Sequence, residues 1–209
     1  MRRNTIAIFA GGVVLAVALA VVAVWQPWNR ADAMPTGTVP VQGTAIPANQ
    51  EVEGVSLPDP AILQSLGGEE AVVLANSWQR EYPMISTVLT STEVIFQYPS
   101  GRTYEVSLPE DRMAVSIAPY ISRTHPCMTH SISGCQGELV GQEFDVRVTS
   151  DDEIIFEGTA TTQANGFFEL WLPRDGTYTV EIAGLGRVAA GEFSTFGTSQ
   201  TCLTEFRLL

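Results

Sequence analysis

The chain has 209 residues, of which 23 are acidic and 11 basic, giving a formal net charge of −12. Hydrophobic residues make up 45% and charged residues 16%, which fits a folded protein with a buried core and excludes a disordered chain. Every basic residue is an arginine. An acidic chain without a basic run argues against nucleic acid and against anionic lipid surfaces as partners.

An apolar segment comes after two arginines at positions 2 and 3. The uncharged stretch 4–28 is apolar almost throughout, and a run of about 20 such residues can span a bilayer. Positive residues ahead of this segment place the N-terminus in the cytoplasm and the C-terminal remainder outside it. The Ala-Asp-Ala sequence at 31–33 also resembles a signal cleavage site. Residues 1–33 are therefore predicted to be a signal peptide or a transmembrane anchor. In either case the remainder is extracytoplasmic, anchored to the cell membrane or secreted or periplasmic, and meets the membrane only through this segment.

Residues 34–55 are rich in proline and glycine and have no sustained apolar period, which predicts an extended linker. The next segment, 56–122, is predicted to be a small α+β unit. Asp59 before Pro60 is typical of a helix start, and a second helix should begin at Glu69-Glu70 and end before Pro83. Three strands are expected after it, over 92–97, 103–108 and 113–121. Without a recognisable catalytic arrangement, this unit is assigned to packing or homodimerisation.

Short alternating segments separated by turns fill the remainder of the chain. Phe144, Val146 and Val148 alternate with charged residues, and Asn165-Gly166 is a strong turn signal. Six or more such strands, the last over 201–208, predict an antiparallel β-sandwich-like domain. The predicted fold class is therefore α+β, with a small helix and strand unit followed by a β-rich metal-binding domain over 123–209.

Sulfur and imidazole side chains are concentrated between these two units. The stretch 124–138, called the cysteine loop below, contains Cys127, Cys135, His125, His130 and Met128, and so holds both histidines of the chain. Thiolates and thioethers favour Cu(I), Zn or Fe–S chemistry, and imidazole suits copper and zinc. The cysteines are eight positions apart, which is neither a zinc-ribbon spacing nor a C-x-x-C redox pair. For the histidines and the methionine, ordinary loop or packing roles stay open.

Cys202, in the last predicted strand, is the third cysteine. Its alternation with Thr204, Phe206 and Leu208 predicts an inward-facing side chain. Two interpretations stay open, a buried small hydrophobe or a thiol that faces the cysteine loop. An odd number of cysteines in an exported chain favours a reactive thiol or a site built from three thiolates.

The cysteine loop and its flanks resemble the CueP family of extracytoplasmic copper-binding proteins. The resemblance rests on Ser-Ile-Ala-Pro-Tyr at 116–120, His-Pro-Cys at 125–127, His130, and Gly-Cys-Gln-Gly-Glu-Leu at 134–139. It extends from about Asp59 to the C-terminus. It implies copper sequestration in copper resistance, an N-terminal dimerisation part, thiol-dependent reduction of Cu(II), and delivery of copper to a periplasmic superoxide dismutase. The family's three cysteines correspond to Cys127, Cys135 and Cys202.

The leading hypothesis is a protein that sequesters or chaperones Cu(I) through Cys127, Cys135 and Cys202, with His125 and His130 as further metal ligands. Reduction of Cu(II) by the thiols is an additional, enzyme-like possibility. The expected partners are the copper ion, a second copy of the chain, a thiol-disulfide reductant and a copper-receiving enzyme. Two alternatives stay open: a thiol-disulfide oxidoreductase that binds metal incidentally, and a structural cell-surface β-sandwich with one disulfide.

Overall fold

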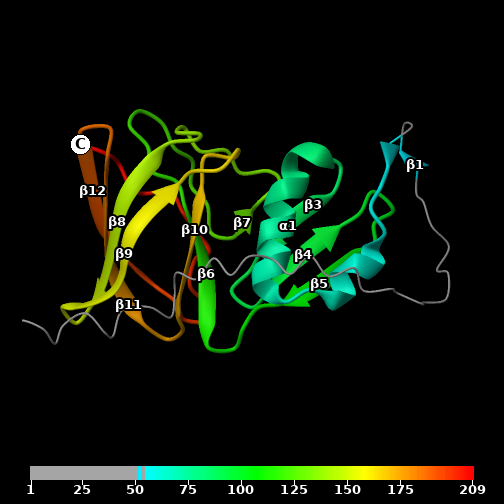
Figure 1. Cartoon of the computed structure of the whole chain (residues 1–209), viewed down its shortest axis with the longest axis horizontal. Helices are drawn as coiled ribbons and strands as arrows, with labels where there is room; N and C mark the ends of the chain where they lie inside the picture. Colours follow the sequence, from blue (N-terminus) through cyan, green and yellow to red (C-terminus); the bar gives the residue numbers. More distant parts are fainter. Residues whose placement is uncertain (1–50, 53–54) are drawn as a thin grey trace, which may run out of the picture. The chain divides into compact units, whose positions relative to one another are not determined.

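The structure is a computed structural model that describes residues 51–52 and 55–209 (Figure 1). The predicted signal or anchor segment and most of the predicted linker lie outside the described residues. In the described part of the chain, no helix is long and apolar enough to cross a membrane. All the described residues belong to one compact unit.

The elements of the described chain are mainly short antiparallel strands with one α-helix. In chain order they are β1 (Glu51–Val52), β2 (Val55–Ser56), the 3₁₀ helix η1 (Pro60–Ser65), α1 (Gly68–Glu81), β3 (Ser86–Leu89), β4 (Glu93–Gln97), β5 (Thr103–Ser107), β6 (Arg112–Ile117), β7 (His130–Ser131), β8 (Glu143–Ser150), β9 (Glu153–Thr161), β10 (Phe168–Pro173), β11 (Thr177–Gly184), β12 (Arg187–Ser194) and β13 (Cys202–Leu203).

Helix α1 packs against a four-stranded sheet of order β5-β4-β3-β7 (Figure 1). The preceding helix η1 is capped by Asp59, whose Oδ1 accepts a hydrogen bond from the N–H of Ala61 at 2.9 Å. Glu69 and Glu70 occupy the first turn of α1, where they face the positive end of the helix dipole. The apolar side of α1 centres on Trp78, which meets the ring of Phe96 on β4 edge to face, with centroids 5.6 Å apart. This core therefore fixes the sheet that carries β7 and His130.

Two further sheets share a second core. One is four-stranded and antiparallel, in the order β12-β11-β8-β9, and the other is three-stranded, in the order β10-β6-β13. The predicted alternation is present, because Phe144, Val146 and Val148 are buried while the charged residues 143, 145 and 147 are exposed. Burying such side chains contributes roughly 1.5–3 kcal/mol each. Strand β13 pairs with β6 in parallel, and β10 pairs with β6 antiparallel.

The strands differ from the sequence prediction in several places. Strands β1, β2, β3 and β7 were not predicted. The expected strand over 201–208 is paired only at β13, with one further bridge between Tyr120 and Arg207. The sheets also extend across the expected boundary near residue 122. Strand β6, before the boundary, pairs with β10 and β13, whereas β7, after it, joins the sheet beside α1. Alternation along the sequence indicates strands, but it does not indicate the sheet that each strand joins.

Candidate metal centre

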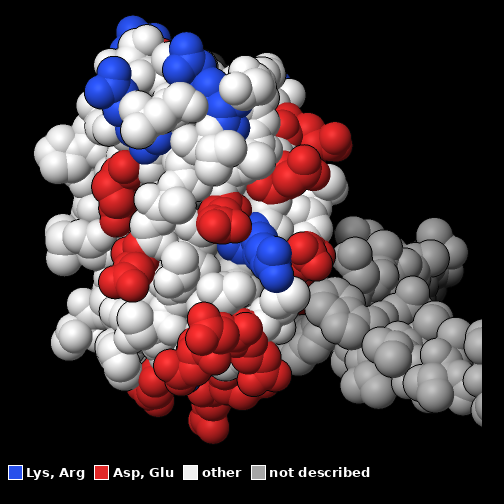
Figure 2. Space-filling model, turned by 90° about the vertical axis from the view of Figure 1, so that its left-hand side faces the viewer, with Lys and Arg blue, Asp and Glu red and all other residues white. Residues whose placement is uncertain are grey.

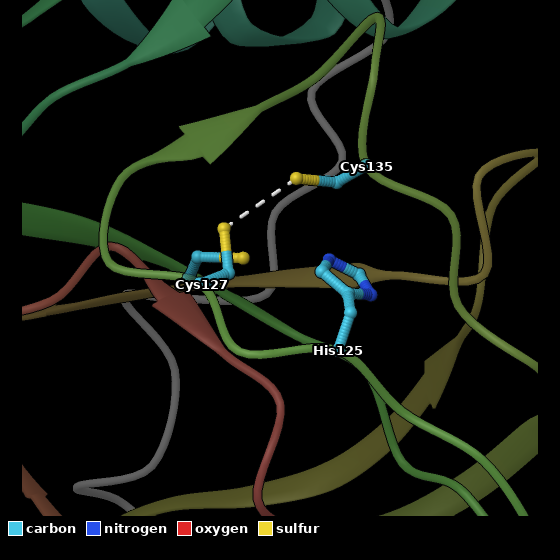
Figure 3. Close-up of side chains that lie close together, drawn as sticks. His125, Cys127 and Cys135 are labelled. Atoms are coloured by element: carbon cyan, nitrogen blue, oxygen red, sulfur yellow. Dashed lines mark hydrogen bonds between the residues drawn. The ribbon is translucent and has the colours of Figure 1, made fainter.

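Three sulfurs and one imidazole converge at the junction of these sheets. The Sγ atoms of Cys127, Cys135 and Cys202 and a ring nitrogen of His125 all lie within 4.8 Å of one another. The Sγ atoms of Cys127 and Cys135 are 3.5 Å apart, and all three cysteines are free thiols. Figure 3 shows His125 and these two cysteines turned toward a common space. The structure thus brings together four of the five predicted site residues, although they come from separate segments.

The segment carrying Cys135 is held by a close backbone crossing. The N–H of Cys135 donates to the carbonyl of Ser131 at 2.8 Å, which forms a tight turn after β7. The N–H of Gly137 then donates to the carbonyl of Asn165 at 2.6 Å. A Cβ at Gly137 would lie 2.5 Å from the carbonyl oxygen of Gly166, so this crossing admits only glycine without a shift of the backbone. The turn predicted at Asn165-Gly166 therefore supports the cysteine loop.

Cys127 lies on the opposite, more open side of the cluster. Its thiol donates to the carbonyl of Thr129 at 3.3 Å, and it lines a groove of about 680 Å³ together with His125 and Met128. The Met128 side chain is 61% exposed, and its Sδ accepts a hydrogen bond from Nε2 of Gln200 at 2.9 Å. This groove is the side from which a metal ion or a partner can reach the thiols.

Cys202 forms the floor of the cluster. Its side chain is completely buried, and it packs with Ala118 and Phe167 in a small apolar cluster against which Cys127 and Cys135 also lie. The backbone of β13 is fixed by its parallel pairing with β6, in which Cys202 is opposite Ser116. Both interpretations of Cys202 from sequence therefore hold in part, because the thiol is buried and also faces the loop.

The two histidines occupy different places. His125 belongs to the converging group, and its Nε2 is buried with no hydrogen-bond partner among the described residues. His130 lies outside that group, although its side chain is fully buried and neither ring nitrogen has a partner within the described part of the chain. Its ring rests on Phe167 with centroids 4.4 Å apart. Buried polar atoms are normally paired, and the groups that face these imidazoles include the Cys135 thiol, whose pKa both histidines lower.

The neighbouring residues that shape the site were missed from sequence. Phe167 lies against both imidazoles, with the His125 ring 6.4 Å from it edge to face. Glu138 precedes β8 and accepts hydrogen bonds from the backbone N–H groups of Ile121 and Ser122, at 2.7 and 2.8 Å. The only local signals were the Asn165-Gly166 turn before Phe167 and the carboxylate at the end of the cysteine loop.

Contacts among the thiols separate their acidities. The hydrogen bond from Cys202 lowers the pKa of Cys135 well below its usual value, and the imidazoles of His130 and His125 lower it further. The same hydrogen bond raises the pKa of Cys202, because a proton shared with Cys135 is harder to remove, and burial adds to this effect. Burial is also the main cause that raises the pKa of Cys127. Of the three thiols, Cys135 is therefore the one that ionises most readily.

This donor set fits a soft metal ion. Thiolates bound to one ion at about 2.3 Å would lie about 4 Å from each other, which is the scale of the cluster. Three thiolates and an imidazole suit Cu(I), and zinc would also accept them. The carboxylates of the described residues do not enter the converging group, which argues against a hard ion such as Ca²⁺ or Mg²⁺ at this position.

Comparison with known proteins agrees with this donor set. The family model described as periplasmic copper-binding protein CueP matches residues 72–207, well over half of the chain. This chain belongs to the CueP family. A solved structure titled "Crystal Structure of S.CueP" has a sequence 34% identical to this chain. The match covers 74% of this chain and 99% of the solved chain, with a TM-score of 0.66. No curated protein matches the chain.

Membership of the CueP family confirms the resemblance seen in the sequence. The family is described as periplasmic and copper-binding, so this member is an extracytoplasmic protein that binds copper. The matched region contains the whole cysteine loop and Cys202. Within this CueP family member, the thiol and imidazole cluster is the group of side chains suited to that metal.

Proposed function

We propose that this CueP family member holds one Cu(I) ion through Cys127, Cys135 and Cys202, with the His125 imidazole as an additional donor. The observation that carries the proposal is the convergence of these four donor atoms within 4.8 Å. The Cys135 thiolate supplies the first ligand without losing a proton, and the ion displaces protons from the other two thiols. Sequestration of copper in this way would limit the free ion outside the cytoplasm and serve copper resistance.

The experiment is an anaerobic titration of the reduced protein with Cu(I) in competition with a colorimetric chelator, combined with native mass spectrometry. A one-to-one complex is expected. Serine in place of Cys127, Cys135 or Cys202 should weaken it by more than about 100-fold, because changes outside the ligand shell already cost 10–100-fold. Tight one-to-one binding that survives all three single substitutions would end the proposal.

The roles of the histidines can be tested separately. We propose that His125 binds the metal, whereas His130 faces Cys135 from the buried side and joins the ligand set when Cu(II) is captured. Its two unpartnered nitrogens support this second role. His125→Gln is expected to weaken Cu(I) binding by about 10-fold, and His130→Gln to weaken mainly Cu(II) capture. An unchanged affinity for both ions in His125→Gln would remove it from the site.

Reduction of Cu(II) by the thiols is a second proposed function, favoured by the 3.5 Å distance between Sγ of Cys127 and Sγ of Cys135. A disulfide requires about 2.05 Å, which a small movement of the loop can reach. Two Cu(II) ions would each take one electron, giving two Cu(I), and the Cys127 thiol and the Cys135 thiolate would form one disulfide with the release of one proton. Anaerobic mixing with excess Cu(II) should yield two Cu(I) and lose two thiols per chain, and Cys127→Ser should abolish both.

Reduction consumes two of the three proposed ligands, so repeated use requires a thiol-disulfide reductant. The groove beside Cys127 is the proposed approach for such a partner and for a copper-receiving enzyme. Homodimerisation through the part around α1 remains a prediction.

Two results would favour the alternative functions. Disulfide exchange that is insensitive to copper chelators would indicate an oxidoreductase, and a stable disulfide with no metal affinity would indicate a structural protein.

A further inference from the structure

The turn between β11 and β12 presents apolar side chains to solvent. Leu185 is 51% exposed and Val188 is 54% exposed. The C-terminal Leu209, 78% exposed, lies beside them, because Val188 and Leu209 exchange two backbone hydrogen bonds of 3.1 and 3.4 Å. Single exposed apolar residues are common on protein surfaces, but three at one protruding end of a sheet form a patch.

The backbone of this turn is unusual for the residue it contains. Gly184 pairs with Arg187, which leaves Leu185 and Gly186 as a two-residue hairpin turn with φ of 56° and 70°. Such a turn favours asparagine, aspartate or glycine at the first position, because a side chain with positive φ is strained. Leucine in this position adds strain and places an apolar group in water. Residues held in such strained backbone conformations cluster at functional sites.

Arginines from three distant segments lie near this tip. Arg187 lies in the turn itself, and Nε of Arg207 donates to the carbonyl of Ile121 at 3.2 Å, which brings it next to Arg123. All three side chains are exposed, and none forms an ion pair with another described residue. Figure 2 shows basic side chains gathered at one end of the molecule and a dense acidic group at the opposite end. The basic end is the one that carries the C-terminus (Figures 1 and 2).

We propose that this tip, formed by the three apolar residues and the three arginines, docks on the anionic headgroups of a lipid bilayer. Apolar side chains enter the interface while guanidinium groups bind the phosphates, and both contributions add to membrane affinity. A protruding tip suits a bilayer surface better than a pocket on a protein. The net charge of −12 argued against anionic lipid surfaces, and the sequence predicted membrane contact only through the N-terminal segment, because arginines 123, 187 and 207 become neighbours only in the folded chain.

The tip is independent of the proposed copper chemistry but adjacent to it. The segment from Tyr120 to Arg123 leads directly into the cysteine loop and is bridged to Arg207. Docking would therefore hold the copper site close to the membrane surface. The proposal requires no change at the thiols, so its failure would leave the proposed copper binding intact.

The test uses the full chain reconstituted in vesicles. The N-terminal segment is then the same in every sample, so a difference between vesicle types or between variants comes from the tip. Hydrogen exchange of the exposed amides of Leu185 and Gly186 is measured in phosphatidylcholine vesicles with and without phosphatidylglycerol. Anionic vesicles are expected to slow their exchange, and a salt concentration of about 0.5 M to reverse the effect. Arg187→Gln should reduce the docking equilibrium about fivefold, the effect of one arginine near an anionic surface.

Leu185→Asn is the decisive variant, since asparagine tolerates the left-handed backbone while removing the apolar group. It should lose the vesicle-dependent protection while its thermal midpoint rises by roughly 2–4 °C, which excludes misfolding as the cause. The matched control is Val73→Gln on α1, which removes a 63% exposed apolar side chain elsewhere and should change nothing. Equal exchange in both vesicle types, or full protection in Leu185→Asn, would overturn the proposal. Slower exchange of these amides without vesicles, increasing with protein concentration, would mean that the tip contacts a second copy of the chain. That result would also overturn the proposal of lipid docking.

Discussion

The backbone N–H of His130 donates to Oγ1 of Thr201 at 2.9 Å and so joins the cysteine loop to the residue before Cys202. The same Oγ1 donates to the carbonyl of Leu89 at 2.7 Å. The backbone of Thr201 completes the connection, because its N–H donates to the carbonyl of Met128 at 3.0 Å. One buried threonine therefore links β3, the cysteine loop and β13, and it sets the distance between the loop thiols and Cys202.

Removal of this hydroxyl should loosen the site. Thr201→Val keeps the shape of the side chain but leaves the N–H of His130 and the carbonyl of Leu89 unpaired. We expect a loss of about 1–3 kcal/mol in the free energy of unfolding and weaker Cu(I) binding. Thr201→Ser, which keeps the hydroxyl, should retain most of both. Urea unfolding of the reduced apo protein and chelator competition measure the two effects. A valine variant as stable as the serine variant would show that the linkage does not matter.

The sequence was most informative about which residues are buried and least informative about their partners. The alternation around Cys202 correctly predicted a buried side chain, as for Phe206 and Leu208. The expected eight-residue strand is nevertheless only two residues long, and its partner β6 lies 86 positions earlier in the chain. Hydrophobic periodicity indicates a strand locally, but it gives no indication of a parallel pairing with a segment so far away in the sequence.

In the candidate site, too, the sequence identified residues but not their partners. Composition and the family resemblance led to Cys127, Cys135, Cys202 and His125, which the structure brings together, whereas their role as metal ligands stays a prediction. His130 could not be separated from His125 by sequence, since both lie in one loop and differ only in the side chains that fold against them. The role of Glu138 also left no local signal, because its partners are backbone groups 15 to 17 positions earlier.

The thiols should react in a fixed order in the apo protein. The thiolate is the nucleophile, and Cys135 has the lowered pKa, whereas burial and hydrogen bonding raise the pKa of Cys127 and Cys202. With limiting iodoacetamide at about pH 6, Cys135 should be alkylated first and the fully buried Cys202 last. Peptide mass spectrometry over time gives the order. Faster labelling of Cys127, which is similarly accessible, would show that the Cys202 hydrogen bond does not stabilise the Cys135 thiolate.

Copper binding should strengthen as the pH rises. The raised pKa values of Cys127 and Cys202 mean that both thiols are protonated near neutral pH, so protons compete with the metal. The logarithm of the Cu(I) affinity should rise by about two per pH unit between roughly pH 6 and 8. Chelator competition at several pH values measures this slope. Cys127→Ser should reduce it to about one, whereas Cys135→Ser should lower the affinity and keep the slope near two. A slope close to zero in the native protein would mean that the thiols are already ionised.

Glu138 should stabilise the cysteine loop only while it is ionised. Its Oε2 accepts hydrogen bonds from the N–H groups of Ile121, Ser122 and Arg123, and the first two of these mainly hold its pKa below the ordinary value of 4.5. A lowered carboxyl pKa contributes stability that is present above the unfolded pKa and is lost as the pH falls through the folded pKa. At pH 7, Glu138→Gln is therefore expected to lower the thermal midpoint by roughly 2–4 °C.

The pH series decides whether ionisation is the cause. The difference between the native protein and Glu138→Gln should shrink below about pH 4 and vanish once the native carboxyl is protonated. Glu143→Gln, at the exposed start of β8, is the matched control and should show little difference at any pH. Thermal unfolding of the reduced apo proteins from about pH 3 to 7 provides the measurement. A constant difference between native protein and Glu138→Gln over that range would mean that side-chain shape, and not charge, holds residues 121–123 beside the cysteine loop.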